Sequence, residues 1–318
     1  MSREELITRK LSTRNRSNEV ENMLLITGIT GHTGRYFLRE LINNKYEGPI
    51  RCIVRASSDM SMLDNSGLNI EKVIGDINDE DLLDKCMKSV DTVFHIAHIG
   101  YTLKIIKAAI NNNVRRAICV HTTGIYSKFR KASEEYIDIE TKLKDIISYS
   151  NIKVTILRPT MIYGDMCDKN MSKFIKMVDH LRIFPVVDHG KSLIQPVNAR
   201  DLGKAYYSVL MLPDDKLRSE YILSGEKPVT IIEALKLISD NLGKKTMFIN
   251  VPSGFAEFLA RIAKALTLGK IDYIEKVQRM TENRSFSHEE ATLDFGYNPE
   301  AFEVGIAREV QEYFKNRK

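Results

Sequence analysis

Cysteine is scarce in this chain and is not arranged for metal binding. The 318 residues contain four cysteines, which lie far apart and include no Cys-x-x-Cys pair. Closely spaced ligands are typical of zinc sites, and a chain of this length does not depend on a disulfide framework. Cys52 and Cys119 lie in apolar, strand-like runs, where a thiol is usually a small buried side chain. We therefore predict no metal site and a reducing compartment, the cytoplasm.

Long apolar runs and blocks of like charge are also missing. No apolar run is long enough to span a bilayer. The net charge of +5 is spread along the chain, with acidic residues between the basic ones, whereas nucleic-acid-binding proteins cluster lysine and arginine on one face. We predict no membrane and no nucleic-acid partner. Residues 1–22 are polar and lack the apolar core of a signal peptide, so we expect a disordered arm.

The most informative feature is a glycine-rich turn between an apolar run, Met23–Ile26, and an amphipathic helical pattern. Its glycines permit a sharp turn, close approach of the backbone to a pyrophosphate, and tight packing of the helix on the strand. The start of the helix presents unpaired N–H groups and a partial positive charge to phosphates. The turn predicts dinucleotide binding by Thr27, Gly28, Thr30, Gly31, His32, Thr33 and Gly34.

Strand-sized apolar runs alternate with helical patterns as far as Pro159. This alternation predicts an α/β fold with a doubly wound parallel sheet, in which ligands bind at the carboxyl ends of the strands. The expected strands are Ile50–Val54, Lys72–Ile74, Thr92–Ile96, Ala117–His121 and Val154–Leu157, with helical patterns at Leu82–Lys88 and Leu103–Asn111.

Beyond Pro159 the pattern loosens, and we expect shorter strands at Leu193–Val197, Tyr221–Leu223 and Met247–Val251. We interpret residues 23–165, with returning segments near 193–222, as the dinucleotide-binding domain, and residues 166–318 mainly as a smaller α/β substrate lobe. An apolar stripe from Phe255 to Leu266 has helical spacing. We expect it to pack in the core or to cover the lobe rather than to meet a membrane or a partner helix.

The end of the second expected strand indicates which nicotinamide cofactor binds. Selectivity for NAD normally depends on a carboxylate that accepts a hydrogen bond from the 2′-hydroxyl of the ribose. No acidic residue stands at the end of this strand. Arg55 stands there instead, and an arginine can pair with a 2′-phosphate. Asp59 lies too far along to be the obvious acceptor. We predict NADP(H) as the preferred cofactor, with NAD(H) as the alternative.

Five local motifs, in this order, resemble those of extended and atypical short-chain dehydrogenases/reductases, the NAD-dependent epimerase/dehydratase group. They are the glycine turn, Gly75–Ile77, Val93–His98, Val120–Tyr126 and Leu157–Gly164. The resemblance implies an NAD(P)-binding Rossmann fold. It also implies a set of further cofactor-binding residues: Asp76, Ile77, Ala97, His98, Pro159, Thr160 and Met161.

The resemblance also assigns catalytic roles. It implies that Thr122 holds the substrate oxygen and that Tyr136 exchanges a proton with it. In this family a lysine four residues after the tyrosine supports its phenolate, but here that position holds Glu140, which would disfavour the phenolate. Lys142 is about 200° round the helix from Glu140 and points elsewhere. Tyr126 with Arg130 has the right spacing but falls at another position of the family pattern.

The resemblance implies an NAD(P)-dependent oxidoreductase or nucleotide-sugar epimerase-like enzyme that uses hydride transfer at a nicotinamide. Because of Glu140, a regulator or scaffold that binds NADP(H) with weak or no turnover stays open as the alternative. The expected substrate is a nucleotide sugar or a carbonyl compound, and a homodimer through a helical face is common in the family. Substrate contacts are expected from Gln195, Phe184–Val187 and the basic side chains of Lys169, Lys173 and Lys191.

Overall fold

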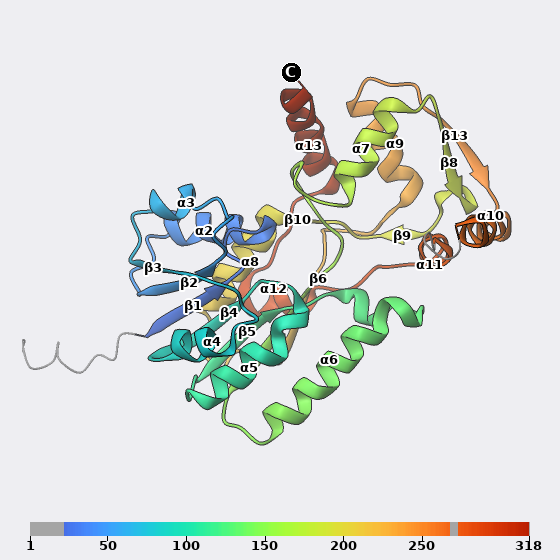
Figure 1. Cartoon of the computed structure of the whole chain (residues 1–318). Coiled ribbons are helices and arrows are strands. Elements are labelled where there is room, and N and C mark those ends of the chain that lie inside the picture. Colours follow the sequence, from blue (N-terminus) through green and yellow to red (C-terminus); the bar gives the residue numbers. More distant parts are fainter. Residues whose placement is uncertain (1–21, 268–272, 318) are drawn as a thin grey trace, which may run out of the picture.

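A parallel sheet of seven strands forms the centre of the protein, whose computed structural model describes residues 22–267 and 273–317 (Figure 1). The strand order is β11-β6-β5-β4-β1-β2-β3, and every neighbouring pair is parallel. The chain starts in the middle at β1, moves outward to β3 and then crosses to β4, so its direction of travel switches between β1 and β4. The strands are β1 (Met23–Thr27), β2 (Ile50–Val54), β3 (Ile70–Ile74), β4 (Val90–His95), β5 (Arg116–Val120), β6 (Lys153–Pro159) and β11 (Glu220–Leu223).

Helices cover both faces of this sheet, which confirms the predicted doubly wound fold. One face carries α2 (His32–Asn43) and α8 (Ala199–Met211), and the other carries α4 (Glu80–Met87), α5 (Thr102–Asn111) and α6 (Arg130–Ser148). Each face buries its own hydrophobic cluster, because side chains on parallel strands alternate between two covered faces. The predicted N-terminal arm lies outside the described residues, apart from residue 22.

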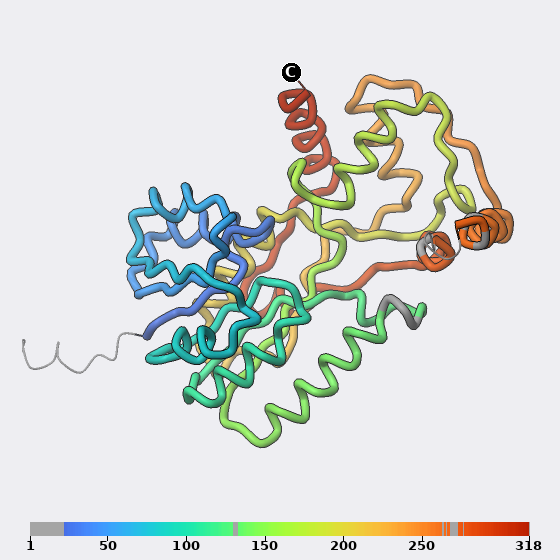
Figure 2. Tube along the Cα trace, in the orientation of Figure 1, coloured from blue at the N-terminus to red at the C-terminus, as the bar shows by residue number. Residues whose placement is uncertain are grey.

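A smaller lobe with a third hydrophobic cluster stands beside the carboxyl ends of the strands. The lobe contains α7 (Met171–His180), α9 (Ile231–Asn241), α13 (Phe302–Arg317) and three two-stranded sheets. Those sheets pair β7 (Ile162–Tyr163) with β10 (Val197–Asn198), β9 (Leu193–Ile194) with β12 (Val229–Thr230), and β8 (Ile183–Val187) with β13 (Met247–Val251). Between α11 (Ile274–Arg279) and α12 (Glu289–Phe295), the chain runs back from the lobe to the central sheet (Figure 2).

Two expectations for the lobe are wrong. The strand expected at Leu193–Val197 is interrupted at Gln195 and Pro196, because proline has no N–H group to donate to a strand ladder. The apolar stripe of α10 (Ser253–Leu266) faces outward instead of inward: Phe258 is 57% exposed and Leu266 is 80% exposed. The helix buries the small Ala260 instead, at the outer edge of the lobe in Figure 1. Within the described ranges, no helix is both long and apolar enough to cross a membrane.

Candidate functional site

A cleft of about 780 Å³ lies at the carboxyl ends of β1, β2 and β4, where the strand order switches. Open α/β sheets bind their ligands at this position. Gly28 has a φ of +77°, and a Cβ atom there would lie 2.6 Å from the backbone nitrogen of Ala97. Gly31 precedes α2, and no side chain caps the first N–H groups of that helix. The turn therefore leaves room and backbone donors for a pyrophosphate, so its residues fit a dinucleotide.

Most of the residues predicted to bind the cofactor line this cleft, but five do not: Thr160 and Met161 line a neighbouring cavity, and Thr27, Gly34 and Pro159 line neither. Thr27 is fully buried, and its hydroxyl lies 2.6 Å from Nδ1 of His95. Gly34 packs α2 against the turn, since a Cβ atom there would lie 2.1 Å from the Gly28 oxygen. Pro159 belongs to β6 and does not line the cleft. The predicted residues that do line it are Gly28, Thr30, Gly31, His32, Thr33, Arg55, Asp76, Ile77, Ala97 and His98.

Asp59 also lines the cleft, although its distance along the chain from the second strand suggests that it cannot reach the ribose. The turn after β2 brings it back: the Ser58 amide donates to the Arg55 carbonyl at 2.9 Å. The Asp59 carboxylate accepts from the Ser61 amide at 2.9 Å, which lowers the pKa of Asp59. Arg55 and Asp59 therefore share the wall that follows β2.

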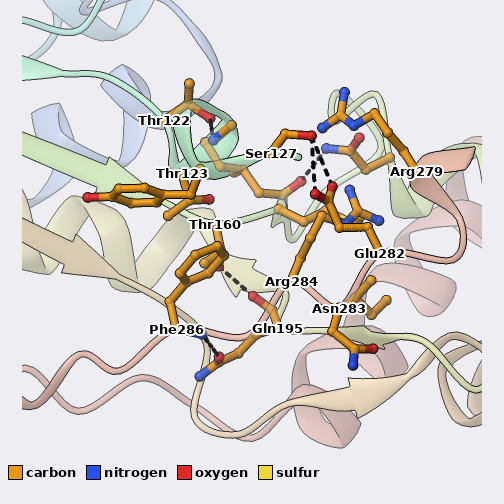
Figure 3. A pocket seen from close by; sticks show the side chains of 16 residues that line it. Thr122, Thr123, Ser127, Thr160, Gln195, Arg279, Glu282, Asn283, Arg284 and Phe286 are labelled. Atoms are coloured by element: carbon orange, nitrogen blue, oxygen red, sulfur yellow. Dashed lines mark hydrogen bonds between the residues drawn. The ribbon is translucent and has the colours of Figure 1, made fainter. Parts of the chain in front are cut away.

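Figure 3 shows a second cavity, of about 280 Å³. This cavity adjoins the cofactor cleft, since Ile162 lines both. One wall consists of residues at the ends of β5 and β6, including Thr122, Thr160 and Met161, which were predicted from the sequence. The opposite wall is the segment that runs back from the lobe, which carries Arg279, Glu282, Asn283, Arg284 and Phe286. Sequence reasoning missed this wall, because the segment has no apolar period and no family motif marks it.

Hydrogen bonds fix the returning segment across the cavity. The Glu282 carboxylate accepts from the Ser127 hydroxyl at 3.0 Å and from the Lys128 amide at 2.6 Å. At the other end, the Phe286 amide donates to the side-chain oxygen of Gln195 at 2.8 Å. Gln195 was expected to give substrate specificity, but its amide NH₂ also donates to Ser224 and Gly225, so the side chain holds the wall.

Two arginines of this wall have unused donors. The Nε atoms of Arg279 and Arg284 are buried and bond to no group within the described residues. Burial, together with the nearby Arg279 charge, lowers the pKa of Arg284. A buried, unsatisfied guanidinium donor is costly, so an anionic group in the cavity would be favoured there. These arginines occupy the place expected for lysines: Lys169 lines the cofactor cleft instead, and neither Lys173 nor Lys191 lines the cavity.

The expected lobe contacts at Phe184–Val187 are also misplaced. These residues form β8, and Phe184 and Val186 are buried in the lobe's hydrophobic cluster. Neither side chain lines the cavity. The alternation of a strand explains this position, because residues two apart share one face and here that face packs on α9 and its neighbours.

The side chains of Thr122 and Tyr136 both lie next to Gly124. The Thr122 hydroxyl oxygen accepts from the Gly124 amide at 3.0 Å, which leaves its hydrogen free to donate into the cavity. Tyr136, on α6, is half-buried and does not itself line the cavity. Its ring packs against Gly124, where a Cβ atom would lie 3.1 Å from Cε2 of Tyr136.

Glu140, at the position where the family resembled in sequence has a lysine, is held in a buried ion pair. Arg158 on β6 donates to its two carboxylate oxygens at 2.5 and 2.7 Å, and Nδ1 of His121 lies 2.9 Å away. Burial alone would raise the pKa of Glu140, but the bonds from Arg158 and His121 outweigh it and lower the pKa to about 2. Lys142 offers no replacement, since it pairs with Asp138 on the exposed side of the helix. The side chain of Arg130 lies outside what the structure describes.

Other titratable groups near the site are accounted for by packing. Burial lowers the pKa of His95 to about 3, so this histidine is neutral, and its ring contacts the buried Thr27 hydroxyl. Cys52 and Cys119 are fully buried, and burial raises the pKa of each thiol to about 12. Across residues 22–267 and 273–317, no group of three His, Cys, Asp or Glu side chains is placed to hold a metal ion.

Comparisons with known proteins agree with this architecture. Residues 28–176 match the model of a family described as NAD(P)H-binding. UDP-glucose 4-epimerase of Vibrio cholerae is 20% identical in an alignment of 333 positions, gaps included, that covers 92% of this chain and 95% of that protein. A UDP-glucose 4-epimerase structure from Thermotoga maritima, with UDP-glucose, superposes with a TM-score of 0.69 at 16% identity over 93% of this chain and all of the other. A dTDP-glucose 4,6-dehydratase from Streptomyces venezuelae, with NAD bound, gives a TM-score of 0.70 at 19% identity over 92% and 97% of the two chains.

Proposed function

We propose that the protein is an NAD(P)-dependent oxidoreductase or epimerase-like enzyme acting on a nucleoside-diphosphate sugar, because residues 28–176 match an NAD(P)H-binding family model and the glycine turn lies at the switch of a parallel sheet. The observation that carries the substrate class is the pair of unsatisfied, buried arginine donors in the cavity beside the cofactor cleft. A diphosphate matches these donors better than a neutral carbonyl compound does. The relatives named for UDP-glucose and dTDP-glucose support the same class.

The cofactor site uses the glycine turn and the wall after β2. The N–H groups at the start of α2 face the position of a pyrophosphate, and Arg55 provides a cation for a 2′-phosphate, which favours NADP(H) over NAD(H). When bound, the nicotinamide supplies the group that accepts or donates a hydride. Thr160 and Met161 line the adjoining cavity and would border the nicotinamide end.

Thr122 and Tyr136 are the proposed catalytic residues. The Thr122 hydroxyl, fixed by the Gly124 amide, donates to the oxygen of a substrate carbonyl or hydroxyl. Tyr136 exchanges a proton with that oxygen. Replacing Tyr136 with Phe should therefore lower kcat about 100-fold or more while KM changes little. The Tyr149→Phe variant is the control, because Tyr149 is 93% exposed at the far end of the same helix.

The substrate class is tested by titrating UDP into the wild-type protein and the Arg284→Gln variant. Loss of a charged donor to the diphosphate should raise the Kd for UDP about 10-fold. Arg182→Gln, at an exposed arginine next to β8, is the matched control and should leave the Kd unchanged. Equal affinity of wild type and Arg284→Gln for UDP would rule out a diphosphate at this wall.

The cofactor is tested by titrating NADPH and NADH side by side, with Arg55→Gln as the diagnostic variant. We expect tighter binding of NADPH, and a loss of that preference in the variant. Preference for NADH in the wild type would refute the Arg55 argument. No binding of either compound would refute the proposed function as a whole.

A second candidate function is a cofactor-binding regulator or scaffold with little turnover. The observation that favours it is the ion pair between Glu140 and Arg158. Glu140 occupies the position of the family's lysine, and Arg158 balances its charge, so no cation is left there to support a tyrosine phenolate. Under this function the protein binds NADPH and UDP, yet single-turnover mixing with a UDP-sugar or a carbonyl compound gives no change in nicotinamide absorbance. Any turnover that Tyr136→Phe abolishes would exclude it.

A further inference from the structure

A short loop of the smaller lobe forms part of the cofactor cleft. The loop 165–170, Asp165–Asn170, connects β7 with α7. Its first residue is tied to α2: the Asp165 carboxylate accepts from the Tyr36 hydroxyl at 2.8 Å and lies 3.1 Å from Nε2 of His32. Arg35 adds a third contact at 3.3 Å. This end of the loop is thereby fixed beside the glycine turn.

The other end of the loop is fixed to the lobe. Asp168 is buried, and its carboxylate accepts from the Asn170 amide at 2.5 Å. The Ser172 hydroxyl donates to the Asp168 carbonyl at 2.6 Å, which ties the loop to the start of α7. The Asn170 side chain, which lines the substrate cavity, donates to the Ile162 carbonyl at 3.0 Å. The backbone on both sides of residue 169 is therefore held in place.

Lys169 lies between these anchors and lines the cofactor cleft. The side chain is exposed, and no hydrogen bond or ion pair joins its ammonium group to another of the described residues. Among the described residues that line the cleft, Lys169 and Arg55 are the only lysine and arginine. The glycine turn has no other basic side chain than His32, which already contacts Asp165.

We propose that Lys169 binds the pyrophosphate of the nicotinamide dinucleotide, reaching it from the lobe side of the cleft. This inference rests on the proposed function, since it assumes that a dinucleotide occupies the cleft. Asp165 attaches the loop to His32 in the turn that faces the pyrophosphate, whereas Arg55 stands at the end of β2, where the ribose 2′-position lies. A lysine ammonium is a compact point charge that suits a phosphate without requiring a planar fork.

The test is calorimetric titration of ADP-ribose, NADH and NADPH into wild type and Lys169→Gln. The pyrophosphate is common to all three ligands, so the variant should raise all three Kd values by a similar factor, about 10-fold. Lys173→Gln is the matched control: Lys173 is exposed on α7 four residues later and lines neither the cleft nor the cavity. Arg55→Gln should instead weaken NADPH selectively.

Two results would overturn the assignment while leaving the proposed function intact. One is binding to Lys169→Gln with unchanged affinity for all three ligands. The other is a loss restricted to NADPH, which would place Lys169 at the 2′-phosphate. A wild-type protein that binds none of the three ligands would refute the proposed function, and this inference with it. Thermal unfolding of each variant checks that the fold is retained, since Lys169 makes no bond within the described residues whose loss would destabilise it.

Discussion

Glu140 in the cofactor-binding half and Glu309 in the smaller lobe are both buried, and the two side chains are in opposite electrostatic states. Glu140 on α6 is 4% exposed and Glu309 on α13 is fully buried. Hydrogen bonds from Arg158 and His121 lower the pKa of Glu140 to about 2. Burial, together with the neighbouring Asp168 carboxyl, raises the pKa of Glu309 well above its ordinary value of 4.5. Within the described part of the chain, the Glu309 carboxyl accepts a hydrogen bond from the Gly164 amide alone, at 3.0 Å.

The difference shows that the partner, and not the depth of burial, decides the charge of a buried carboxyl. Two arginine donors stabilise the ionised form of Glu140 more than burial destabilises it. One amide and a second carboxyl leave the neutral form of Glu309 favoured. The cofactor-binding half therefore contains a fixed negative charge, that of Glu140, balanced by Arg158, whereas the buried Glu309 of the lobe favours its neutral form.

The largest effect is expected from Glu140→Lys, which introduces the lysine that short-chain dehydrogenases/reductases have at the corresponding position. A lysine there would bury a second cation next to Arg158 and His121 and remove their partner. We expect the free energy of unfolding to fall by about 3–5 kcal/mol and no gain in reductase activity. Urea denaturation measures the loss, with Glu134→Lys on an exposed turn of the same helix as the control. A stable Glu140→Lys protein with raised turnover would contradict the structural role of the ion pair.

The next effect is a loss of stability in acid that depends on Glu140. Because the pKa of Glu140 in the folded protein lies below its ordinary 4.5, its ionised form stabilises the fold above that pH. This contribution, about 3 kcal/mol, should disappear as the pH falls from 4.5 to 2. Unfolding curves of the wild type and Glu140→Gln over this range isolate it, since the variant lacks the titrating group. Parallel pH dependences in the two proteins would show that Glu140 does not titrate as described.

Glu309 should produce the opposite pH dependence. Its pKa is raised in the folded state, so folding binds a proton above pH 4.5, and stability should fall as the pH rises beyond that value. The slope contributed by one such group is at most about 1.4 kcal/mol per pH unit. Glu309→Gln keeps the acceptor for Gly164 and removes the titration, so its stability should be flatter between pH 6 and pH 9. Glu303→Gln, on a partly exposed turn of α13, is the control.

The smallest effect is expected at Asp165, a third buried carboxylate, which joins the two regions. Its partners on α2 are His32, Arg35 and Tyr36. Burial would raise the pKa of Asp165, but the contacts with His32 and Tyr36 outweigh it and hold the pKa below its usual range. Asp165→Asn should therefore cost about 1–2 kcal/mol of stability and weaken cofactor binding a few-fold. Asp138→Asn, which breaks an exposed pair with Lys142, should cost less than about 0.5 kcal/mol. Equal losses in both variants would show that the Asp165 contacts are no stronger than a surface pair.

The features that the sequence predicts well depend on local patterns. Ile50–Val54 and Met247–Val251 are strands with the predicted bounds, and the predicted glycine turn follows the strand at which the order of the sheet switches. Sequence spacing alone says nothing about which distant side chains meet. Glu140 on α6 accepts a hydrogen bond from Arg158 on β6, and the Phe286 amide donates to the side chain of Gln195, 91 positions earlier in the chain.

The apolar stripe of α10 shows a second limit. Phe255 and Phe258 have the helical spacing of a buried face, yet both are more than half exposed. Periodicity predicts that a helix has an apolar face, but the direction of that face depends on whether another element packs there. The same limit applies to Arg279 and Arg284, which reach the cavity only because Glu282 holds their segment across it.

The returning segment also has a consequence for the order in which the protein matures on the ribosome. All the residues that line the cofactor cleft have been synthesised once Lys169 is made, whereas the far wall of the substrate cavity waits for Phe286. Domains fold as units, the N-terminal ones first, during synthesis. A nascent chain thus contains every residue of its dinucleotide cleft long before it can enclose a substrate.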